Sequence, residues 1–572
     1  MMSLTLFALA LSIAADEPST AVVTPTAALA EMRQIVLSDR GHASISIIGK
    51  SWTGLPIEVV SLSENVMDAD KKPAILLVAG LDGSRPSSVA IAVAAMKKIL
   101  ADQPALQAST FYLIPCANPD AYIDTFMPSD SRANRNARPV DEDRDGLSDE
   151  DPPRDLNGDG AITQIRRLNP PASDPATHML DPADVRLMRM PDATKDQRAT
   201  YSMYVEGLDS DHDGLIAEDD FGGVDIDRNF PHRWPEFDPA AGRYQLSEPE
   251  SQALANFVLA HPRIIAAMVI GRWDNLVKTP DAQARDATGK TPLALDSLDK
   301  ATWEEMGRLW REVSKQTRSQ ECDPSGSFAL WLYAHRGIPT FATQAWGRPD
   351  ASALPPPPPL PPNADGSAAT APAPAPAAAD KPADEEAAAW LAWSDRDQGG
   401  RGFLPWTPFE HPTLGHVEIG GFRSGFRSDP PAGEIARLGD SVASFLAELS
   451  KRQPKLVMRN ITSRMTGAGV FEIEAEIVNE GWLATACAMG RANRQPDPII
   501  VRISPTKDHI LSGQRVTIID GITGAGGRRA FRWIVQSPPT EPITIEATWK
   551  PMGTLRATII GDKVVLPIEV IQ

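Results

Sequence analysis

Three short acidic segments share one spacing of oxygen-bearing side chains, D-x-[DN]-x-[DN]-G. In this pattern alternate side-chain oxygens converge on one hard cation, and the glycine permits the sharp turn that lets a backbone carbonyl join them. We therefore expect the segments to bind calcium. The predicted ligands are Asp141, Asp143, Asp145 and Asp149 in the first, Asp155, Asn157 and Asp159 in the second, and Asp209, Asp211, Asp213 and Asp220 in the third.

The segments depart from the EF-hand at its last ligand position, where a bidentate glutamate is usual. Asp220 stands there in the third segment, Arg166 in the second and Pro152 in the first. The pattern therefore favours calcium as a structural staple rather than as a sensed signal. The alternative is a solvated acidic surface, but uncompensated carboxylates would repel one another and leave this apolar-poor stretch loose.

Histidine and cysteine offer weaker sites. His411 and His416, with Glu410 and Glu418 nearby, could form a zinc site, but their spacing does not place both histidines on one helix face. Packing or hydrogen-bonding roles are the favoured interpretation. The cysteines form no C-x-x-C pair, which excludes a cysteine zinc site and a disulfide framework; they are Cys116, Cys322 and Cys487.

Composition limits the function classes. The chain has 572 residues and a net charge of -19, which argues against nucleic-acid binding, because that needs a basic surface. An apolar run over 4–15, followed by Asp16, resembles a secretory signal. We therefore expect a signal peptide over residues 1–15 and export to the periplasm, the cell surface or the medium. No later run is long enough for a transmembrane helix, so we expect no integral membrane protein.

The elements that must position these residues alternate between strands and helices over residues 24–450. Strands are expected at 43–62 (two, around a turn), 74–81, 110–122, 264–270 and 340–346, and helices in the intervening stretches and at 432–450. This order predicts an α/β fold with a doubly wound, mostly parallel sheet, which binds ligands at the carboxyl ends of its strands.

Two stretches interrupt this pattern and one domain follows it. Residues 129–223 form the acidic insertion, and 351–386 are Pro- and Ala-rich and are expected to be disordered or polyproline-like. From about residue 456 to 572, short alternating strands separated by turn residues predict a C-terminal β-sandwich.

Several motifs, in order, resemble those of the zinc carboxypeptidases of the carboxypeptidase A-like fold. The matching segments are GKSWTGLPIEVVSLS (49–63), PCANPDAY (115–122), GGVDIDRNFPHRW (222–234) and GSFALWLYAHRGIPTFATQAW (326–346). With the acidic insertion, HPTLGHVEIGG and the C-terminal β domain, the chain looks like a bacterial branch of that family. The resemblance implies a carboxypeptidase-type sheet over roughly residues 43–450, a zinc cofactor and release of C-terminal residues from peptides.

The positions that would carry this chemistry are altered. The resemblance places zinc ligands at Asp82, Arg85 and Gly271 (or its neighbour Arg272), and the general base at Gln344. A carboxylate can bind zinc, but a guanidinium has no lone pair to donate, and a glycine has no side chain. An amide cannot accept the proton that a general base must take. The zinc ligands and the base are therefore predicted to be lost.

Residues that would hold a substrate are better matched. Arg228 aligns with the family arginine that recognises a C-terminal carboxylate, and Asp227 replaces the family's asparagine beside it. Arg135 is a candidate for a second such arginine, with Arg132 and Arg138 as alternative registers. The alternative role for Arg228 is a structural ion pair with Asp225 or Asp227.

Three functions follow from these readings. The first is an exported, catalytically inactive protein that binds peptide or peptidoglycan-like ligands in the former cleft and calcium in the acidic loops. The second is an active metallocarboxypeptidase with an atypical zinc site that uses Asp82. The third is a calcium-stabilised structural protein of the cell surface.

Overall fold

The computed structural model describes residues 25–124, 134–140, 152–210, 214–217, 222–349 and 384–571. The predicted signal peptide and most of the Pro- and Ala-rich segment lie outside this part of the chain. So do seven predicted calcium ligands: Asp141, Asp143, Asp145, Asp149, Asp211, Asp213 and Asp220. Within the described ranges, no helix is long and apolar enough to cross a bilayer.

A six-stranded mixed sheet forms the centre of the large domain, in the order β1-β2-β4-β3-β9-β10. Strands β4, β3, β9 and β10 run parallel, and β1 and β2 complete the sheet antiparallel. Every residue of β3, β4 and β9 is buried, as expected of strands covered on both faces. The predicted α/β sheet is confirmed. Its strands are β1 (Ala43–Lys50), β2 (Pro56–Leu62), β3 (Ala74–Val78), β4 (Thr110–Ile114), β9 (Ile264–Ile270) and β10 (Thr340–Thr343).

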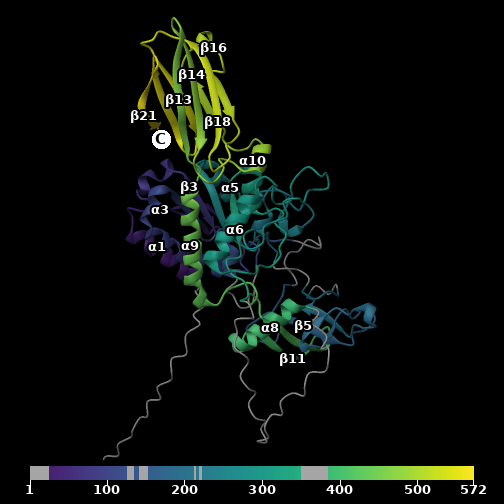
Figure 1. Ribbon diagram of the computed structural model, residues 1–572. Helices are drawn as coiled ribbons and strands as arrows, with labels where there is room; N and C mark the ends of the chain where they lie inside the picture. The colour runs from purple at the N-terminus through teal and green to yellow at the C-terminus, as the bar shows by residue number, and fades with distance from the viewer. Residues whose placement is uncertain are drawn as a thin grey trace, which may run out of the picture.

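Helices surround this sheet (Figure 1). Both α6 and α9 carry an apolar face that is buried and a charged face that is exposed. The helices are α1 (Pro25–Ser38), α2 (Ser87–Leu100), α3 (Gln103–Ala108), α4 (Pro119–Asp124), α5 (Pro249–Ala260), α6 (Lys300–Ser314), α7 (Phe328–Trp331) and α9 (Ile435–Lys451). A π-helical turn, Leu332–Arg336, follows α7 and ends at Gly337.

The acidic insertion and the chain after residue 384 fold together into one lobe. Its four-stranded sheet has the order β11-β12-β5-β8, so the two strands of each segment are neighbours and the segments join where β12 pairs with β5. Figure 1 shows α8, β5 and β11 together, apart from the central sheet. The elements are β5 (Gln164–Leu168), β6 (Met179–Asp181), β7 (Asp184–Arg189), β8 (Tyr201–Val205), α8 (Glu385–Asp397), β11 (Phe403–His411) and β12 (Gly415–Phe422).

Two antiparallel sheets make the C-terminal β-sandwich, in the orders β13-β14-β18-β16 and β17-β15-β19-β20-β21. Alternate residues of the strands face inward into one hydrophobic core. The strands are β13 (Leu456–Gly467), β14 (Val470–Asn479), β15 (Ile499–Ile503), β16 (Ile510–Ser512), β17 (Val516–Ile519), β18 (Gly527–Gln536), β19 (Pro542–Trp549), β20 (Gly553–Ile560) and β21 (Lys563–Ile571), with a short helix α10 (Ala488–Ala492).

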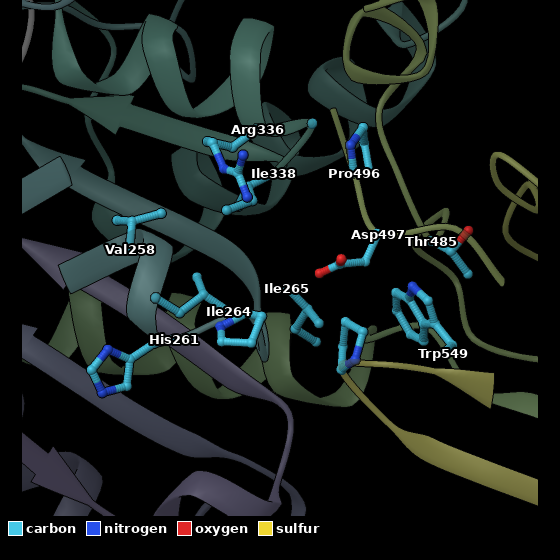
Figure 2. Close-up of a pocket in the computed structure, with 13 residues that line it drawn as sticks. Val258, His261, Ile264, Ile265, Arg336, Ile338, Thr485, Pro496, Asp497 and Trp549 are labelled. Carbon is cyan, nitrogen blue, oxygen red and sulfur yellow. The ribbon is translucent and has the colours of Figure 1, made fainter. Parts of the chain in front are cut away.

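The sandwich and the α/β domain share a packed interface. Leu483, Cys487 and Met489 belong to the core of the α/β domain, whereas Ile265 of β9 packs into the sandwich core. The Cys487 N–H donates to the Gly337 carbonyl at 3.0 Å. Figure 2 shows the crevice that remains between the domains, lined by Arg336, Ile338, Asp497 and Trp549. Its volume of about 40 Å³ is too small for an organic ligand.

Candidate functional site

The positions predicted from the zinc site lie at one edge of the central sheet. Asp82 follows β3, Gly271 follows β9 and Gln344 follows β10, all at the carboxyl ends of parallel strands. Arg85 lies just before α2. This is the edge at which open α/β sheets bind their ligands.

Arg85 is 5% exposed, and its guanidinium is held by the protein itself. One terminal nitrogen donates to the Ser428 carbonyl at 2.7 Å and the other to Gln320 Oε1 at 3.1 Å. Its Nε lies 3.9 Å from Asp82 Oδ2. Burial lowers the pKa of Arg85, and the carboxylates of Asp82 and Asp429 oppose that shift. The side chain at this position is therefore a structural cation that cannot bind a metal.

Asp82 is also engaged locally. Its Oδ1 accepts hydrogen bonds from the backbone N–H of Ser84 at 2.9 Å and from the Ser84 hydroxyl at 2.7 Å. The same carboxylate faces Arg85, as described above. Asp82 thus acts as the cap of a tight turn rather than as an open ligand.

Arg272 is a second cation at this edge; its side chain is 17% exposed, and it forms an ion pair with the buried Asp225. Burial works against its charge, but Asp225, Asp82 and Asp227 together raise the pKa of Arg272. Burial raises the pKa of Asp225 even though Arg272 opposes the shift. Burial likewise raises the pKa of Asp227 to about 7. Arg272 thus supplies much of the positive charge that this group of acids requires, with Arg85 beside Asp82 and Arg228 beside Asp225.

From the sequence, Arg272 was predicted only as the neighbour of the lost ligand, and its pairing with Asp225 was not predicted. A signal was present in the composition of the motifs. Arginines at 85 and 272 accompany an aspartate at 227 where the family has asparagine. Gains of opposite charge in segments that meet at one sheet edge indicate an internal ion-pair network.

Gly271 leaves space beside this network. A Cβ built at Gly271 would lie 3.8 Å from Asp227 Oδ2, which is ordinary van der Waals contact. Asp227 is itself held by the Phe328 N–H, which donates to Oδ1 at 2.9 Å. The third predicted ligand position therefore has room for a side chain but offers no metal donor.

Gln344 is buried, and both ends of its amide are used. Its Nε2 donates to the carbonyls of Arg272 at 2.6 Å and Gln320 at 2.8 Å, and its Oε1 accepts from the Gln320 N–H at 2.8 Å. An amide fits this environment because it offers both donors and an acceptor. A carboxylate at the same place would face two carbonyl oxygens.

We expect Gln344→Glu to destabilise the protein by about 1–3 kcal/mol at pH 8, because the substitution removes two buried hydrogen-bond donors. The loss should shrink near pH 4, where a protonated glutamic acid can again donate. Peptidase activity should not appear. Urea unfolding at both pH values measures the effect, and Gln107→Glu, at an exposed side chain of α3, is the control. Gain of hydrolysis by Gln344→Glu would contradict this interpretation.

Arg228 and Arg135, the predicted substrate-binding residues, both lie beside Asp225. The Arg228 guanidinium pairs with Asp238 and lies 3.9 Å from Asp225 Oδ2, and the side chain keeps 26% exposure. Arg135 forms a backbone bridge with Asp225. The alternative role for Arg228 was an internal ion pair with Asp225 or Asp227. The structure places Arg228 near Asp225 and adds Asp238 as a second partner.

The comparisons with known proteins decide the family. The family model for zinc carboxypeptidases matches residues 29–180 and 186–369. The chain belongs to the zinc carboxypeptidase family. A second model, described as a domain of unknown function, matches residues 455–560. The comparison with curated proteins found no match.

Several solved structures are similar to part of this chain. Carboxypeptidase A from Helicoverpa armigera is 14% identical with a TM-score of 0.35, and the match covers 57% of this chain and 65% of that one. The metallo-carboxypeptidase from Burkholderia cenocepacia is 12% identical with a TM-score of 0.27, over 56% of this chain and 58% of that one. The murein-tripeptide amidase MpaA from Escherichia coli O157 is 15% identical with a TM-score of 0.22, over 52% and 82%.

The motifs that this zinc carboxypeptidase family member retains build the scaffold. Asp120 accepts hydrogen bonds from the hydroxyl of Ser51 at 2.6 Å and from the backbone N–H of Thr53 at 3.2 Å, which joins the first two matching segments. The buried Asn229 amide bonds the carbonyl of Ala241 at 2.8 Å and the hydroxyl of Ser251 at 2.6 Å. The side chains of these motifs therefore hold the scaffold together through contacts that need no zinc.

A segment that sequence reasoning missed covers the former metal position. Besides its contact with Arg85, Ser428 donates its hydroxyl to the Ser84 carbonyl at 3.0 Å. Asp429 accepts from the N–H of Ser87 at 3.0 Å and from its hydroxyl at 2.6 Å, and burial raises the pKa of Asp429 to about 6. The chain after β12 is therefore fastened to the turn between β3 and α2.

The histidines of HPTLGHVEIGG make no metal site in this arrangement. His411 Nε2 bonds the Gly207 carbonyl at 2.8 Å, and its Nδ1 faces the N–H groups of Thr413 and Leu414. His416 is exposed and pairs with Glu410. Glu418 pairs with Arg166 at 2.8 Å. The part of the chain that the structure describes contains no cluster of three His, Cys, Asp or Glu side chains suited to a metal.

Four of the predicted calcium ligands are described, in two loops of the lobe. Asp155 accepts from the N–H groups of Gly158 and Gly160, each at 2.8 Å. The Asn157 side-chain amide donates a hydrogen bond to Asp159 Oδ2 at 2.9 Å. Asp209 is 8% exposed, and its Oδ1 has no hydrogen-bond partner among the described residues.

Proposed function

We propose that this protein is a non-hydrolytic member of the zinc carboxypeptidase family that binds peptide or peptidoglycan-like ligands. The observation that carries the proposal is Arg85 at a zinc-ligand position, buried and bonded to Ser428 and Gln320. A zinc ion there would lie beside a permanent cation and would lack the nitrogen or oxygen donors that it needs. The residues present therefore do not fit zinc.

Elemental analysis of the purified protein tests this proposal. We expect less than about 0.1 zinc per chain, with no release of C-terminal residues from a panel of blocked dipeptides and no effect of a zinc chelator. Asp82→Ala should leave both measurements unchanged. About one zinc per chain, lost in Asp82→Ala together with peptide trimming, would establish the alternative of an active enzyme with an atypical site.

The ligand part of the proposal rests on the family scaffold and on its partly exposed arginine. Arg228 keeps 26% exposure at the carboxyl edge of the sheet, and a guanidinium suits the carboxylate of a peptide end. Export remains part of the proposal, because residues 4–15 carry the apolar run of a secretory signal. Amino-terminal sequencing of the mature protein, recovered from its native cells, checks the cleavage near residue 15.

We propose calcium binding in the acidic loops as a second, structural function. Asp209 supports it, because a buried carboxylate oxygen without a hydrogen-bond donor is unfavourable unless a cation neutralises it. If calcium binding is its main role, the whole chain is a calcium-stabilised structural protein of the cell surface.

Removal of calcium should lower the melting temperature. At free calcium one hundred times above Kd, binding stabilises the folded state by about 2.7 kcal/mol, and EGTA should abolish this contribution. Asp209→Asn should reduce the calcium-dependent shift, whereas Asp562→Asn, in the turn before β21, should leave it unchanged. Differential scanning calorimetry with calcium, magnesium or EGTA makes the measurement. Equal melting temperatures in calcium and EGTA would refute this second function.

A further inference from the structure

A surface pocket beside Gln344 has the size and lining of a ligand site. Its volume is about 530 Å³, within the range of small-molecule and short-peptide sites. Trp346 and Trp390 line it, and their ring centroids lie 5.5 Å apart. A second pocket of about 740 Å³ continues from it and shares Trp346 and Arg348. Buried, mutually packed indoles give such a pocket a rigid apolar wall.

Cations outnumber acids around this pocket, although the whole chain carries a net charge of -19. Arg348 is buried and donates to Glu386 at 3.0 Å, and Arg318 lies 3.6 Å from the same carboxylate. Glu386 therefore serves two guanidinium groups. The lining residues Lys278, Arg318, Arg348 and Arg427 face only two lining acids, Glu321 and Glu386.

Arg427 is an exposed cation in the lining of this pocket. Its guanidinium stacks on the Phe422 ring at 4.9 Å from the centroid, and no carboxylate is paired with it within the described ranges. Lys278 pairs with Glu321 at 2.5 Å, but both side chains are largely exposed, so solvent weakens that pair. A local positive field on an acidic protein attracts anions to this pocket.

We propose that this pocket binds an acidic peptide, with a carboxylate on Arg427 and Lys278 and with apolar atoms against Trp346 and Trp390. The arginine fork suits a carboxylate by bidentate hydrogen bonding, and the indole wall suits the aliphatic part of the chain. The inference rests on the proposed non-hydrolytic role, and it assigns that role a ligand class and a site outside the former zinc positions.

Gln320 connects this pocket to the former metal edge. Its Oε1 accepts from Arg85, and its Nε2 donates to the Arg427 carbonyl at 3.0 Å. Arg85, which stands at a former zinc-ligand position, therefore helps through Gln320 to hold the backbone that presents Arg427. The Gln320 side chain thus links the Arg85 position to the wall of the pocket.

Fluorescence anisotropy with a dye-labelled tri-glutamate peptide tests the proposal on the full chain. We expect saturable binding, weakened about tenfold by Arg427→Gln and about tenfold by Lys278→Gln, the effect of losing one charge-assisted hydrogen bond each. Arg464→Gln removes an exposed arginine from the sandwich strand β13 and should leave binding unchanged. Unlabelled tri-glutamine should not compete. Both pocket residues are exposed, so the variants should fold normally.

The other outcomes are distinct. No binding by the wild type, or binding unaffected by Arg427→Gln, would overturn the pocket assignment. Binding lost in Arg228→Gln but kept in Arg427→Gln would place the ligand at the former cleft and also overturn it. Glutarate binding as tightly as the peptide would overturn the peptide class. Hydrolysis of the peptide by a zinc-containing preparation would refute the proposed function while leaving the pocket in place.

Discussion

Replacing Arg272 with methionine should destabilise the protein by about 3–5 kcal/mol at pH 8, the range for removing one partner of a buried ion pair. The Arg272 guanidinium pairs with Asp225 and also faces Asp82 and Asp227. Methionine fills much of the same volume, so the main effect is electrostatic. Buried carboxylates would remain without the cation that offsets their desolvation.

This effect should depend on pH in a defined direction. Burial raises the pKa of Asp227 from 3.8 to about 7 even with Arg272 present. Between these values the folded state binds more protons than the unfolded state, so this contribution to stability is complete below pH 3.8 and is lost as the pH rises through 7. Arg272→Met should raise the pKa further, so its destabilisation should be small at pH 4 and full at pH 8.

Urea unfolding followed by near-ultraviolet circular dichroism at both pH values measures this result. Arg272→Met with Asp225→Asn is the rescue variant, because it removes a carboxylate together with the cation, and it should recover at least half of the loss. Arg459→Met, which removes an exposed arginine paired with Glu480, is the control. Equal stability of Arg272→Met and wild type at pH 8 would show that Arg272 does not hold the network.

Gly490→Ala should destabilise the interface between the α/β domain and the sandwich by about 3 kcal/mol, the upper end of the usual effect of overpacking. A Cβ at Gly490 would lie 2.2 Å from the Cα of Gly337 and 2.8 Å from its nitrogen. Both are backbone atoms, so no side chain can move aside. Gly337 has a φ of 65° and ends the π-helical turn, which fixes its position.

Gly490→Ala should also weaken the hydrogen bonds that cross the interface between the α/β domain and the sandwich. The Ala488 N–H donates to Asp299 at 2.9 Å, and Asn493 donates to the Ala334 carbonyl at 2.6 Å. Amide hydrogen exchange should therefore increase in α10 and in residues 332–338. Gly433→Ala, where a Cβ meets nothing within 4 Å, should change stability by less than about 0.5 kcal/mol. Similar losses in both variants would exclude steric contact at Gly337 as the cause.

Much of the architecture could be predicted from local pattern. Short continuous apolar runs such as AILLV and IIAAMVI predict buried strands covered on both faces, and alternating runs such as VFEIEAEIVN predict a sandwich. The lobe could not be predicted in the same way. The strands β5 and β8 come from the acidic insertion, whereas β11 and β12 follow residue 400. Pairing between such distant segments leaves no periodic signal within either one.

In the candidate site, too, some properties follow from the residue types and others only from contacts between distant segments. Sequence alone determined which chemistry the positions 82, 85, 271 and 344 can and cannot perform, because donor atoms belong to the residue type. Only the tertiary structure decided where each charge is balanced. It placed Arg272 on Asp225, Arg228 on Asp238, and Arg85 on a carbonyl more than 300 residues away. These pairings depend on distances of a few ångströms between separate elements, and a linear sequence does not encode those distances residue by residue.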